Sequence, residues 1–329
     1  MRATRHFLDL DDLSCAELEA VLRRAEAPAA NLEPVLAGRG AALVFEKPSA
    51  RTRNSTEMAV VALGGHPVYI QGVEVGIDER ETAEDVARTL ACYHAVVCAR
   101  VFDHGVLHRM AGAIDAAVAG AAATDAAGPD DGIGVKSSPV VNLLSDAAHP
   151  CQALADLLTL RQVFGPLEGR SLAYVGDANN VWRSLAKAAA MVGMRLRTAC
   201  PEGYGPEADD LAALAALGLD IEVTDDPVEA ATGADALYSD VWTSMGQEEE
   251  AERRRLAFAG FAIDDTLLSA AAPGAVVLHC LPAHRGEEIT AEVFEGAHSV
   301  VWRQAANRLH AMRGLLSWLL SPGDEGSRP

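Results

Sequence analysis

The segment FEKPSARTR, at residues 45–53, gathers the hydroxyls of Ser49 and Thr52 and the guanidiniums of Arg51 and Arg53. It follows an apolar run typical of a strand and leads directly into the amphipathic stretch 54–63, which places residues 49–53 at a helix N-terminus. Free backbone N–H groups, the helix dipole and guanidiniums favour phosphate at such a position. The alternative is that Ser49 is an ordinary helix cap beside solvated arginines.

Two further segments carry polar side chains at expected element boundaries. His149-Pro150-Cys151-Gln152 stands just ahead of a helix, where a neutral imidazole and a carboxamide can donate hydrogen bonds to a carbonyl oxygen. GDANNV, at 176–181, is a strand end, a tight turn and a helix start. It lacks the G-x-G-x-x-G pattern of dinucleotide binding, so its asparagines are better suited to a small polar ligand above the sheet.

Two segments in the second half follow expected strands. DVWTSMG, at 240–246, offers the carboxylate of Asp240 to an ammonium group, although Asp240 or Ser244 could instead cap the next helix. HCLPAHRGEE, at 279–288, places the thiol of Cys280 at a strand end. A cysteine is most often a small buried hydrophobe, and a nucleophilic role would need a nearby base.

Short Val/Leu/Ile-rich runs alternate with Ala-rich amphipathic stretches, which predicts an α/β protein with parallel sheets. Its length of 329 residues indicates two domains. We predict helices at 53–63, 82–93, 104–112, 151–163 and 305–320, and a loop that begins within 113–138. The predicted strands lie near 41–45, 67–70, 95–99, 140–143, 172–175, 195–199, 220–223, 236–239 and 276–279.

The formal net charge of −20 argues against binding to nucleic acid or to an anionic membrane surface, so any anion site must be a local cationic pocket. The six cysteines include no C-x-x-C pair, which predicts neither a zinc site nor a disulfide framework. No apolar run reaches the roughly 18 residues needed to span a bilayer, and the first residues lack the apolar region of a signal peptide. We therefore expect a soluble, cytoplasmic protein.

Taken together and in this order, the segments resemble the ornithine carbamoyltransferases of the aspartate/ornithine carbamoyltransferase family. The phosphate motif of that family, Ser-Thr-Arg-Thr-Arg after Phe-Glu-Lys, appears as FEKPSARTR, and its His-Pro-Cys-Gln, Asp-x-x-x-Ser-Met-Gly and His-Cys-Leu-Pro strings appear as HPCQ, DVWTSMG and HCLP. Further matches are ARVFDH at 99–104, GDANNV at 176–181 and ANRLHA at 306–311. The resemblance spans about residues 5–320.

The resemblance implies two doubly wound domains joined by a hinge. Residues 1–143 would form a carbamoyl phosphate-binding domain and residues 144–302 an ornithine-binding domain. Residues 303–329 would form a C-terminal helix that packs back on the first domain, followed by a frayed tail.

The resemblance also implies the reaction: transfer of the carbamoyl group of carbamoyl phosphate to the side-chain amine of L-ornithine, giving L-citrulline and phosphate in arginine metabolism. No metal or organic cofactor is implied. The catalytic residues would be Arg51, Arg100, His149, Gln152, Asp240 and Cys280. Carbamoyl phosphate would contact Ser49, Ala50, Arg51, Thr52, Arg100, His149, Gln152, Cys280, Leu281 and Arg308. Ornithine would contact Asn142, Leu144, Asn180, Asp240, Ser244 and Met245.

By the same resemblance, Asp240 would pair with the α-ammonium group of ornithine, and Cys280 would position or tune the attacking amine without forming a covalent bond. Attack would pass through a tetrahedral intermediate whose oxygen is stabilised by preorganised donors. The family is usually built on trimers in which a loop from a neighbouring subunit completes each site, so a homotrimer or a multiple of it is expected.

Three features depart from the family pattern. Ala50 stands where the family usually has threonine, which removes a hydroxyl from the phosphate motif. The stretch 71–81, which corresponds to the loop reaching into the neighbouring site, is acidic, and a carboxylate such as Glu74 facing a phosphate would be unfavourable. The segment 113–138 is longer than the family leads us to expect.

Three alternatives stay open from the sequence. The acceptor could be putrescine, aspartate or an N-acylated ornithine, although the Ser-Met-Gly string favours a free α-amino acid. A nicotinamide-dependent dehydrogenase fits the α/β pattern but not the missing glycine fingerprint. An inactive regulatory paralogue would explain Ala50 and the acidic loop, but not the retained polar residues of the other motifs.

Overall fold

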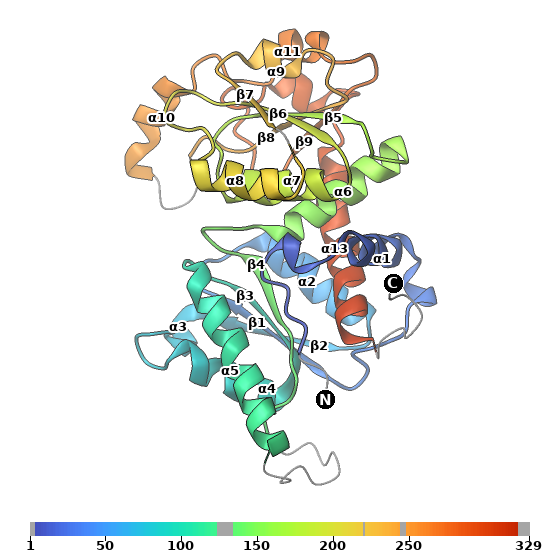
Figure 1. Ribbon diagram of the computed structural model, residues 1–329, viewed down its shortest axis with the longest axis vertical. Coiled ribbons are helices and arrows are strands. Elements are labelled where there is room, and N and C mark those ends of the chain that lie inside the picture. Colours follow the sequence, from blue (N-terminus) through green and yellow to red (C-terminus); the bar gives the residue numbers. More distant parts are fainter. Residues whose placement is uncertain (1–3, 124–133, 220, 244–247, 322–329) are drawn as a thin grey trace. The chain divides into compact units, whose positions relative to one another are not determined.

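The computed structural model describes residues 4–123, 134–219, 221–243 and 248–321, which divide into two compact units (Figure 1). Unit 1 contains the chain up to Cys151 and again from Arg308, and unit 2 is Gln152–Asn307. Two continuous helices, α6 (Pro150–Phe164) and α13 (Val301–Leu320), cross this division. Each unit is built on one parallel sheet, which confirms the predicted α/β class.

The sheet of unit 1 has the strand order β2-β1-β3-β4. Its strands lie at the short runs predicted from the sequence. Three of them, at residues 40–45, 94–100 and 140–144, are largely buried, which explains their apolar character, whereas the edge strand at 66–71 is only half-buried. The strands span Gly40–Phe45 (β1), His66–Gln71 (β2), His94–Arg100 (β3) and Val140–Leu144 (β4). Helices α4 (Ala83–Tyr93) and α5 (His104–Ala123) lie on one face, and α1 (Cys15–Glu26) and α2 (Ala50–Ala62) on the other (Figure 1).

The sheet of unit 2 has the order β7-β6-β5-β8-β9. Its strands span Ser171–Val175 (β5), Arg195–Ala199 (β6), Ile221–Thr224 (β7), Ala236–Ser239 (β8) and Val276–His279 (β9). The helices are α7 (Asn180–Met191), α8 (Ala208–Ala216), α9 (Pro227–Ala231), α10 (Ala251–Ala257), α11 (Asp265–Ala270) and α12 (Ala291–Glu295). One face carries a core of apolar side chains from β5, β8 and β9 packed against α9, α11 and α12.

Both strand orders contain a point where the direction of winding reverses. In unit 1 the reversal falls between β1 and β3, and in unit 2 it falls between β5 and β8. Ligands of open parallel sheets bind in the crevice outside the carboxyl ends of the strands at such a point. FEKPSARTR follows β1 and GDANNV follows β5, so the fold places the main polar segments of each unit at its switch point.

The C-terminal helix α13 belongs to unit 1 from Arg308 onward. The guanidinium of Arg313 donates to the main-chain oxygens of Ala25 and Ala27 at the end of α1. A Cβ atom on Gly314 would lie 2.6 Å from the nitrogen of Ala25, so only glycine permits this close approach of the two helices. Arg5 stacks over the ring of Trp318 with 4.6 Å between the guanidinium carbon and the ring centre.

One predicted boundary was wrong. Helix α5 continues to Ala123 and does not end near residue 112, because the alanines that follow have the highest helix propensity of any residue. The Gly-Pro-Asp-Asp-Gly stretch at 128–132 lies outside the described residues. Within the described ranges, no helix combines the length and apolar character required to cross a bilayer.

Candidate active site

The segment FEKPSARTR leads into the N-terminus of α2, as predicted. Ser49 is the N-cap: its hydroxyl accepts a hydrogen bond from the backbone nitrogen of Thr52 at 3.3 Å and donates to the Thr52 hydroxyl at 3.1 Å. Ala50 is the first helical residue. Arg308, from α13, donates to the same Thr52 hydroxyl at 3.3 Å. The returning helix therefore brings a second cationic side chain to the motif.

Positive charge accumulates at this helix end. Burial, the largest cause, and the charges of Arg308 and Arg51 together lower the pKa of Arg100 to about 10. Among residues with described positions, neither Arg51 nor Arg100 forms an ion pair with a carboxylate, and the buried Nε of Arg100 has no hydrogen-bond partner. Uncompensated guanidiniums repel one another and lose hydration when buried, so the arrangement favours an anion that supplies the missing charge.

His149 precedes α6 and is 5% exposed. Burial, together with the charges of Arg308, Arg100 and Arg51, holds the pKa of its imidazole well below the usual range. The ring is therefore neutral at pH 7. A neutral imidazole can donate one hydrogen bond to a polarised carbonyl oxygen without adding a further charge to the cluster.

Asn142 and Leu144 lie on β4 in unit 1. The buried amide of Asn142 donates to the main-chain oxygen of Leu8 at 2.9 Å and to the hydroxyl of Ser145 at 3.3 Å. These bonds shape the turn that leads to His149. Leu144 is half-buried at the end of the strand.

The acidic stretch 71–81 forms the one-turn helix α3 (Gly72–Val75) and the turn after it. The exposed carboxylate of Glu74 accepts from the backbone nitrogen of Gln71 at 2.7 Å, so it caps its own helix. Arg109 on α5 donates to both Asp78 and Glu84. Local hydrogen bonds and ion pairs thus engage acidic side chains of this stretch within unit 1.

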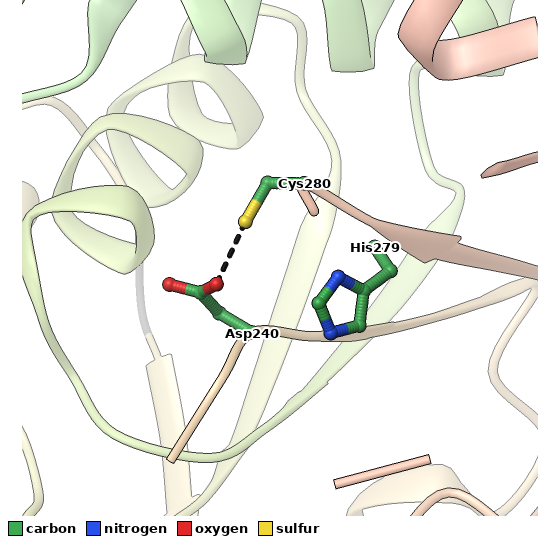
Figure 2. Close-up of side chains that lie close together, drawn as sticks. All are labelled: Asp240, His279 and Cys280. Carbon is green, nitrogen blue, oxygen red and sulfur yellow. Dashed lines mark hydrogen bonds between the residues drawn. The ribbon is translucent and has the colours of Figure 1, made fainter. Parts of the chain in front are cut away.

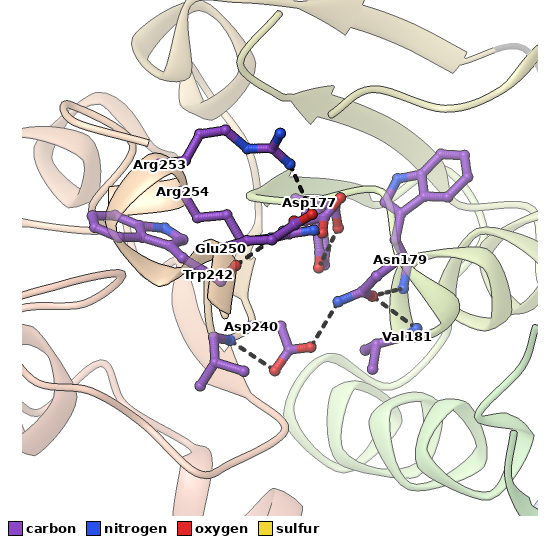
Figure 3. Close-up of polar contacts among 11 residues, drawn as sticks. Asp177, Asn179, Val181, Asp240, Trp242, Glu250, Arg253 and Arg254 are labelled. Carbon is purple, nitrogen blue, oxygen red and sulfur yellow. Dashed lines mark hydrogen bonds and ion pairs between the residues drawn. The ribbon is translucent and has the colours of Figure 1, made fainter. Parts of the chain in front are cut away.

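In unit 2, Asp240 follows β8 and is 6% exposed. One carboxylate oxygen accepts from the thiol of Cys280 at 2.8 Å (Figure 2) and from the nitrogen of Val241 at 2.8 Å. The other accepts from the amide of Asn179 at 3.0 Å (Figure 3). The neighbouring ends of β5, β8 and β9 therefore meet at one carboxylate.

Asn179 was missing from the predicted site. It is the N-cap of α7, where its side-chain oxygen accepts from the nitrogens of Val181 and Trp182 while its amide reaches Asp240 (Figure 3). An asparagine just before a helix signals a cap, but only the strand order shows that its free end faces β8. The predicted Asn180 begins α7 and is half-buried. Ser244 and Met245 lie outside the described residues.

Arg254, on α10, links the segment after β5 to the segment after β8 a second time. A guanidinium nitrogen of Arg254 donates to Asp177 at 2.7 Å and to the main-chain oxygen of Trp242 at 3.0 Å, and Arg254 also pairs with Glu250 (Figure 3). Burial raises the pKa of Asp177, whereas the bond to Arg254 opposes that shift. Arg254 therefore offsets one carboxylate beside Asp240.

Two models of known protein domains match successive parts of the chain. A carbamoyl-P binding domain model of aspartate/ornithine carbamoyltransferases matches residues 5–162, and the Asp/Orn binding domain model matches residues 168–319. Together they cover nearly the whole chain. The chain belongs to the aspartate/ornithine carbamoyltransferase family.

Individual members of the carbamoyltransferase family are similar over nearly their whole length. The ornithine carbamoyltransferase of Acidothermus cellulolyticus is 49% identical over 323 residues, with 96% of each chain covered. A crystal structure of ornithine carbamoyltransferase from Thermus thermophilus superposes with a TM-score of 0.82 at 42% identity, covering 97% of this chain and all of the other. A solved N-acetyl-L-ornithine transcarbamylase reaches a TM-score of 0.79 at 28% identity, covering 95% and 99%.

A buried pair, His279 and Glu288, holds the turn after β9. Neither residue was among the predicted site residues of this carbamoyltransferase chain. His279 Nε2 lies 3.0 Å from a carboxylate oxygen of Glu288, and both side chains are fully buried. Its Nδ1 accepts from the backbone nitrogen of Leu281 at 2.9 Å. Leu281 has a positive φ of 64°, so this bond supports a backbone conformation that leucine rarely adopts.

Two groups in the described part of this carbamoyltransferase chain place possible metal ligands within 4.8 Å of one another. The first is Asp240, His279 and Cys280 (Figure 2). Because both nitrogens of His279 are engaged in other bonds, it leaves only two donors, fewer than the three or four of zinc sites. The second group contains His284, Glu287 and Glu288. The Oε1 atom of Glu288 is already engaged by His279 Nε2 and by the backbone nitrogen of His284.

The remaining predicted residue, Gln152, belongs to unit 2 and is 2% exposed. Its amide nitrogen donates to Asp156 Oδ1 at 2.8 Å. Of the predicted carbamoyl phosphate residues of this family member, unit 1 contains Ser49, Ala50, Arg51, Thr52, Arg100, His149 and Arg308, and unit 2 contains Gln152, Cys280 and Leu281.

Proposed function

We propose that this chain transfers the carbamoyl group of carbamoyl phosphate to the side-chain amine of L-ornithine, giving L-citrulline and phosphate. The observation that carries the proposal is the cationic cluster of Arg51, Arg100 and Arg308 beside the N-terminus of α2, in a chain whose net charge is −20. Nothing in the bulk charge of the protein requires such a cluster, whereas a phosphate-bearing substrate does.

The phosphate would be bound at the start of α2. Backbone N–H groups of the first turn, the hydroxyls of Ser49 and Thr52, and the guanidinium of Arg51 would donate to its oxygens. Ala50 contributes its N–H group as any residue would, so the motif lacks one hydroxyl but keeps the helix-end geometry. When the bond between the carbamoyl carbon and the bridging oxygen breaks, the same donors would stabilise the departing phosphate.

The carbamoyl oxygen would be polarised by Arg100 and His149. Attack by the amine turns the carbonyl oxygen into an oxyanion, and donors fixed before the reaction stabilise that charge without reorganising. The lowered pKa of His149 keeps the imidazole neutral, so it would act as a hydrogen-bond donor. The neutral amine forms a new C–N bond, its extra proton passes to the departing phosphate, and the C–O bond to phosphate breaks.

Ornithine would be bound through Asp240, whose carboxylate would pair with the α-ammonium group. Cys280 and Asn179 fix the orientation of that carboxylate by donating to opposite oxygens. An N-acylated ornithine has no α-ammonium group to pair with Asp240, and aspartate would bring a second carboxylate toward it. These charges, and the greater identity to named ornithine carbamoyltransferases, favour ornithine as the acceptor.

We further propose that the enzyme works in the cytoplasm as a homotrimer or a multiple of it, with no cofactor, which the family resemblance supports. Val73, on α3 in the acidic loop, is 87% exposed, an apolar side chain suited to cover by a neighbouring subunit. Light scattering of the purified protein measures the mass directly. A monomer at micromolar concentration would contradict the assembly.

The acceptor is tested by offering ornithine, putrescine, aspartate and N-acetylornithine at equal concentration with carbamoyl phosphate. We expect phosphate release that depends on ornithine and is at least about 100-fold slower with aspartate and N-acetylornithine, because an unmatched buried charge costs several kcal/mol. Putrescine keeps an ammonium group for Asp240 but brings no α-carboxylate, so it should react more slowly than ornithine because it lacks the carboxylate contacts. Turnover with another amine would keep the carbamoyl phosphate half of the site and refute the assigned acceptor. No turnover with any amine, from folded protein, would refute the proposed function.

A further inference from the structure

The buried carboxylate of Asp156 has no part in the reaction described above. It lies on α6 in unit 2, with no exposed surface. Its Oδ1 accepts from the amide nitrogens of Gln152 at 2.8 Å and Gln304 at 2.7 Å, and its Oδ2 accepts from the hydroxyl of Tyr238 at 3.1 Å. One buried charge thus binds donors from α6, α13 and β8, and three such bonds offset the cost of burying it.

The charge fixes the direction of every bond around it. An ionised carboxylate only accepts, so each neighbouring carboxamide must turn its nitrogen toward Asp156. Gln304 then has its oxygen on the opposite side, where it accepts from the backbone nitrogen of His279 at 2.8 Å. That nitrogen only donates, so both ends of Gln304 are assigned by their partners. Through Gln304, Asp156 holds the main chain at the end of β9, directly before Cys280.

The same reasoning orients Gln152. Its nitrogen faces Asp156, so the oxygen is at the far end of the carboxamide. The sequence led us to expect Gln152 to donate to a carbonyl oxygen, and this geometry favours the reverse polarity. In carbamoyl phosphate, the group that matches a carboxamide oxygen is the –NH2 of the carbamoyl end, which a methyl or hydroxyl group does not reproduce.

We propose that Asp156 is a positioning residue for the carbamoyl half of the reaction. It orients Gln152 so that the glutamine oxygen accepts from the carbamoyl –NH2, and it holds the strand end before Cys280 through Gln304. This inference rests on the proposed function, because it assumes that carbamoyl phosphate is the ligand of Gln152. Its consequence is selectivity between carbamoyl phosphate and acyl phosphates of the same shape.

Asp156→Leu is the informative substitution because it keeps a similar side-chain shape and removes the acceptor of both carboxamides. An asparagine is less informative, since it could keep its oxygen toward both glutamines and donate to the Tyr238 hydroxyl. Inverting Gln304 would oppose its –NH2 to the His279 N–H, so Gln152 is the side chain expected to turn. Tyr238→Phe is the matched control, since it removes the bond to Oδ2 and the 3.3 Å bond from Gln304 to the hydroxyl but leaves both glutamine bonds to Oδ1.

The experiment measures binding of carbamoyl phosphate and of acetyl phosphate, which carries a methyl group in place of –NH2, by calorimetry on the intact oligomer. In Asp156→Leu we expect carbamoyl phosphate to bind about 10-fold more weakly, the effect of one lost hydrogen bond near a charge, and acetyl phosphate to change by less than about twofold. Tyr238→Phe should preserve the wild-type ratio. Gln152→Met should abolish the preference, and adding Asp156→Leu to it should have no further effect on the ratio.

An equal loss for both phosphates in Asp156→Leu would mean a purely structural role and would overturn the inference. An unchanged ratio would overturn it as well. If wild-type protein binds neither phosphate and forms no citrulline, the proposed function fails first, so the two failures are distinguishable. If Asp156→Leu does not fold, Gln304→Leu tests the arm to His279: we expect a lower kcat with the binding ratio of wild type, whereas an unchanged kcat would contradict that arm.

Discussion

Replacing Arg254 by methionine should destabilise unit 2 strongly and in a pH-dependent manner. The side chain of Arg254 is 8% exposed and its guanidinium nitrogen lies 2.7 Å from the carboxylate of Asp177, whose side chain is 16% exposed. Removing one partner of a buried pair leaves an uncompensated charge and typically costs about 3–5 kcal/mol. The substitution also removes the bond to the oxygen of Trp242, so a value near the upper end is expected.

The pH dependence follows from Asp177. Burial already raises the pKa of this carboxyl in the folded protein, and loss of Arg254 removes the contact that opposes the shift. A group whose folded pKa is raised stabilises the fold at low pH, and that contribution is lost as the pH rises through the folded pKa. The deficit of Arg254→Met should therefore be larger at pH 8 than at pH 5.

Urea unfolding followed by tryptophan fluorescence measures the effect, since Trp182 and Trp242 both lie in unit 2. The double variant Arg254→Met, Asp177→Asn is the control, because it removes the orphaned charge and should recover more than half of the lost free energy of unfolding. A deficit that does not depend on pH, or a double variant less stable than Arg254→Met, would refute the assignment of this pair as charge compensation.

Three further predictions concern the proposed site. Arg51→Ala should weaken phosphate binding by about 10-fold or more in calorimetry, the usual effect of a lost charge-assisted bond, and unchanged affinity would remove Arg51 from the phosphate site. Asp240→Asn should raise the ornithine KM at least about 10-fold while the KM of carbamoyl phosphate changes by less than twofold, and equal effects would argue against the α-ammonium pairing. Because its folded pKa is lowered, buried His149 should reduce stability by up to about 1.4 kcal/mol per pH unit as the pH falls below 6.5, and His149→Gln should flatten that slope in thermal melts at pH 5–8.

Much of the fold was predictable because several of its strands are buried on both faces. The run Ala41–Phe45 is continuously apolar, and the structure places β1 there. The end of α5 was not predictable from composition, since the same Ala-rich pattern describes a helix and a small-residue loop. Helix propensity decided between them in the structure.

Some residues of the candidate site were also predictable from the sequence, and others were not. Ser49 was predictable as a cap because a hydroxyl before an amphipathic stretch is a local signal. Asp156 and Arg254 carry no such signal: each is one charged residue in a helix, and only the strand order and packing show that its partners are Gln304 and Asp177. The orientation of Gln152 also depended on a partner four residues away on the buried side of α6.

The central claim is tested most directly by following 13C-labelled carbamoyl phosphate and ornithine by NMR in the presence of the purified protein. The account predicts that the label moves into the ureido carbon of citrulline, with one phosphate released for each citrulline formed and no metal added. A label that stays in carbamoyl phosphate, or appears only in its spontaneous breakdown products at the rate seen without protein, would contradict it.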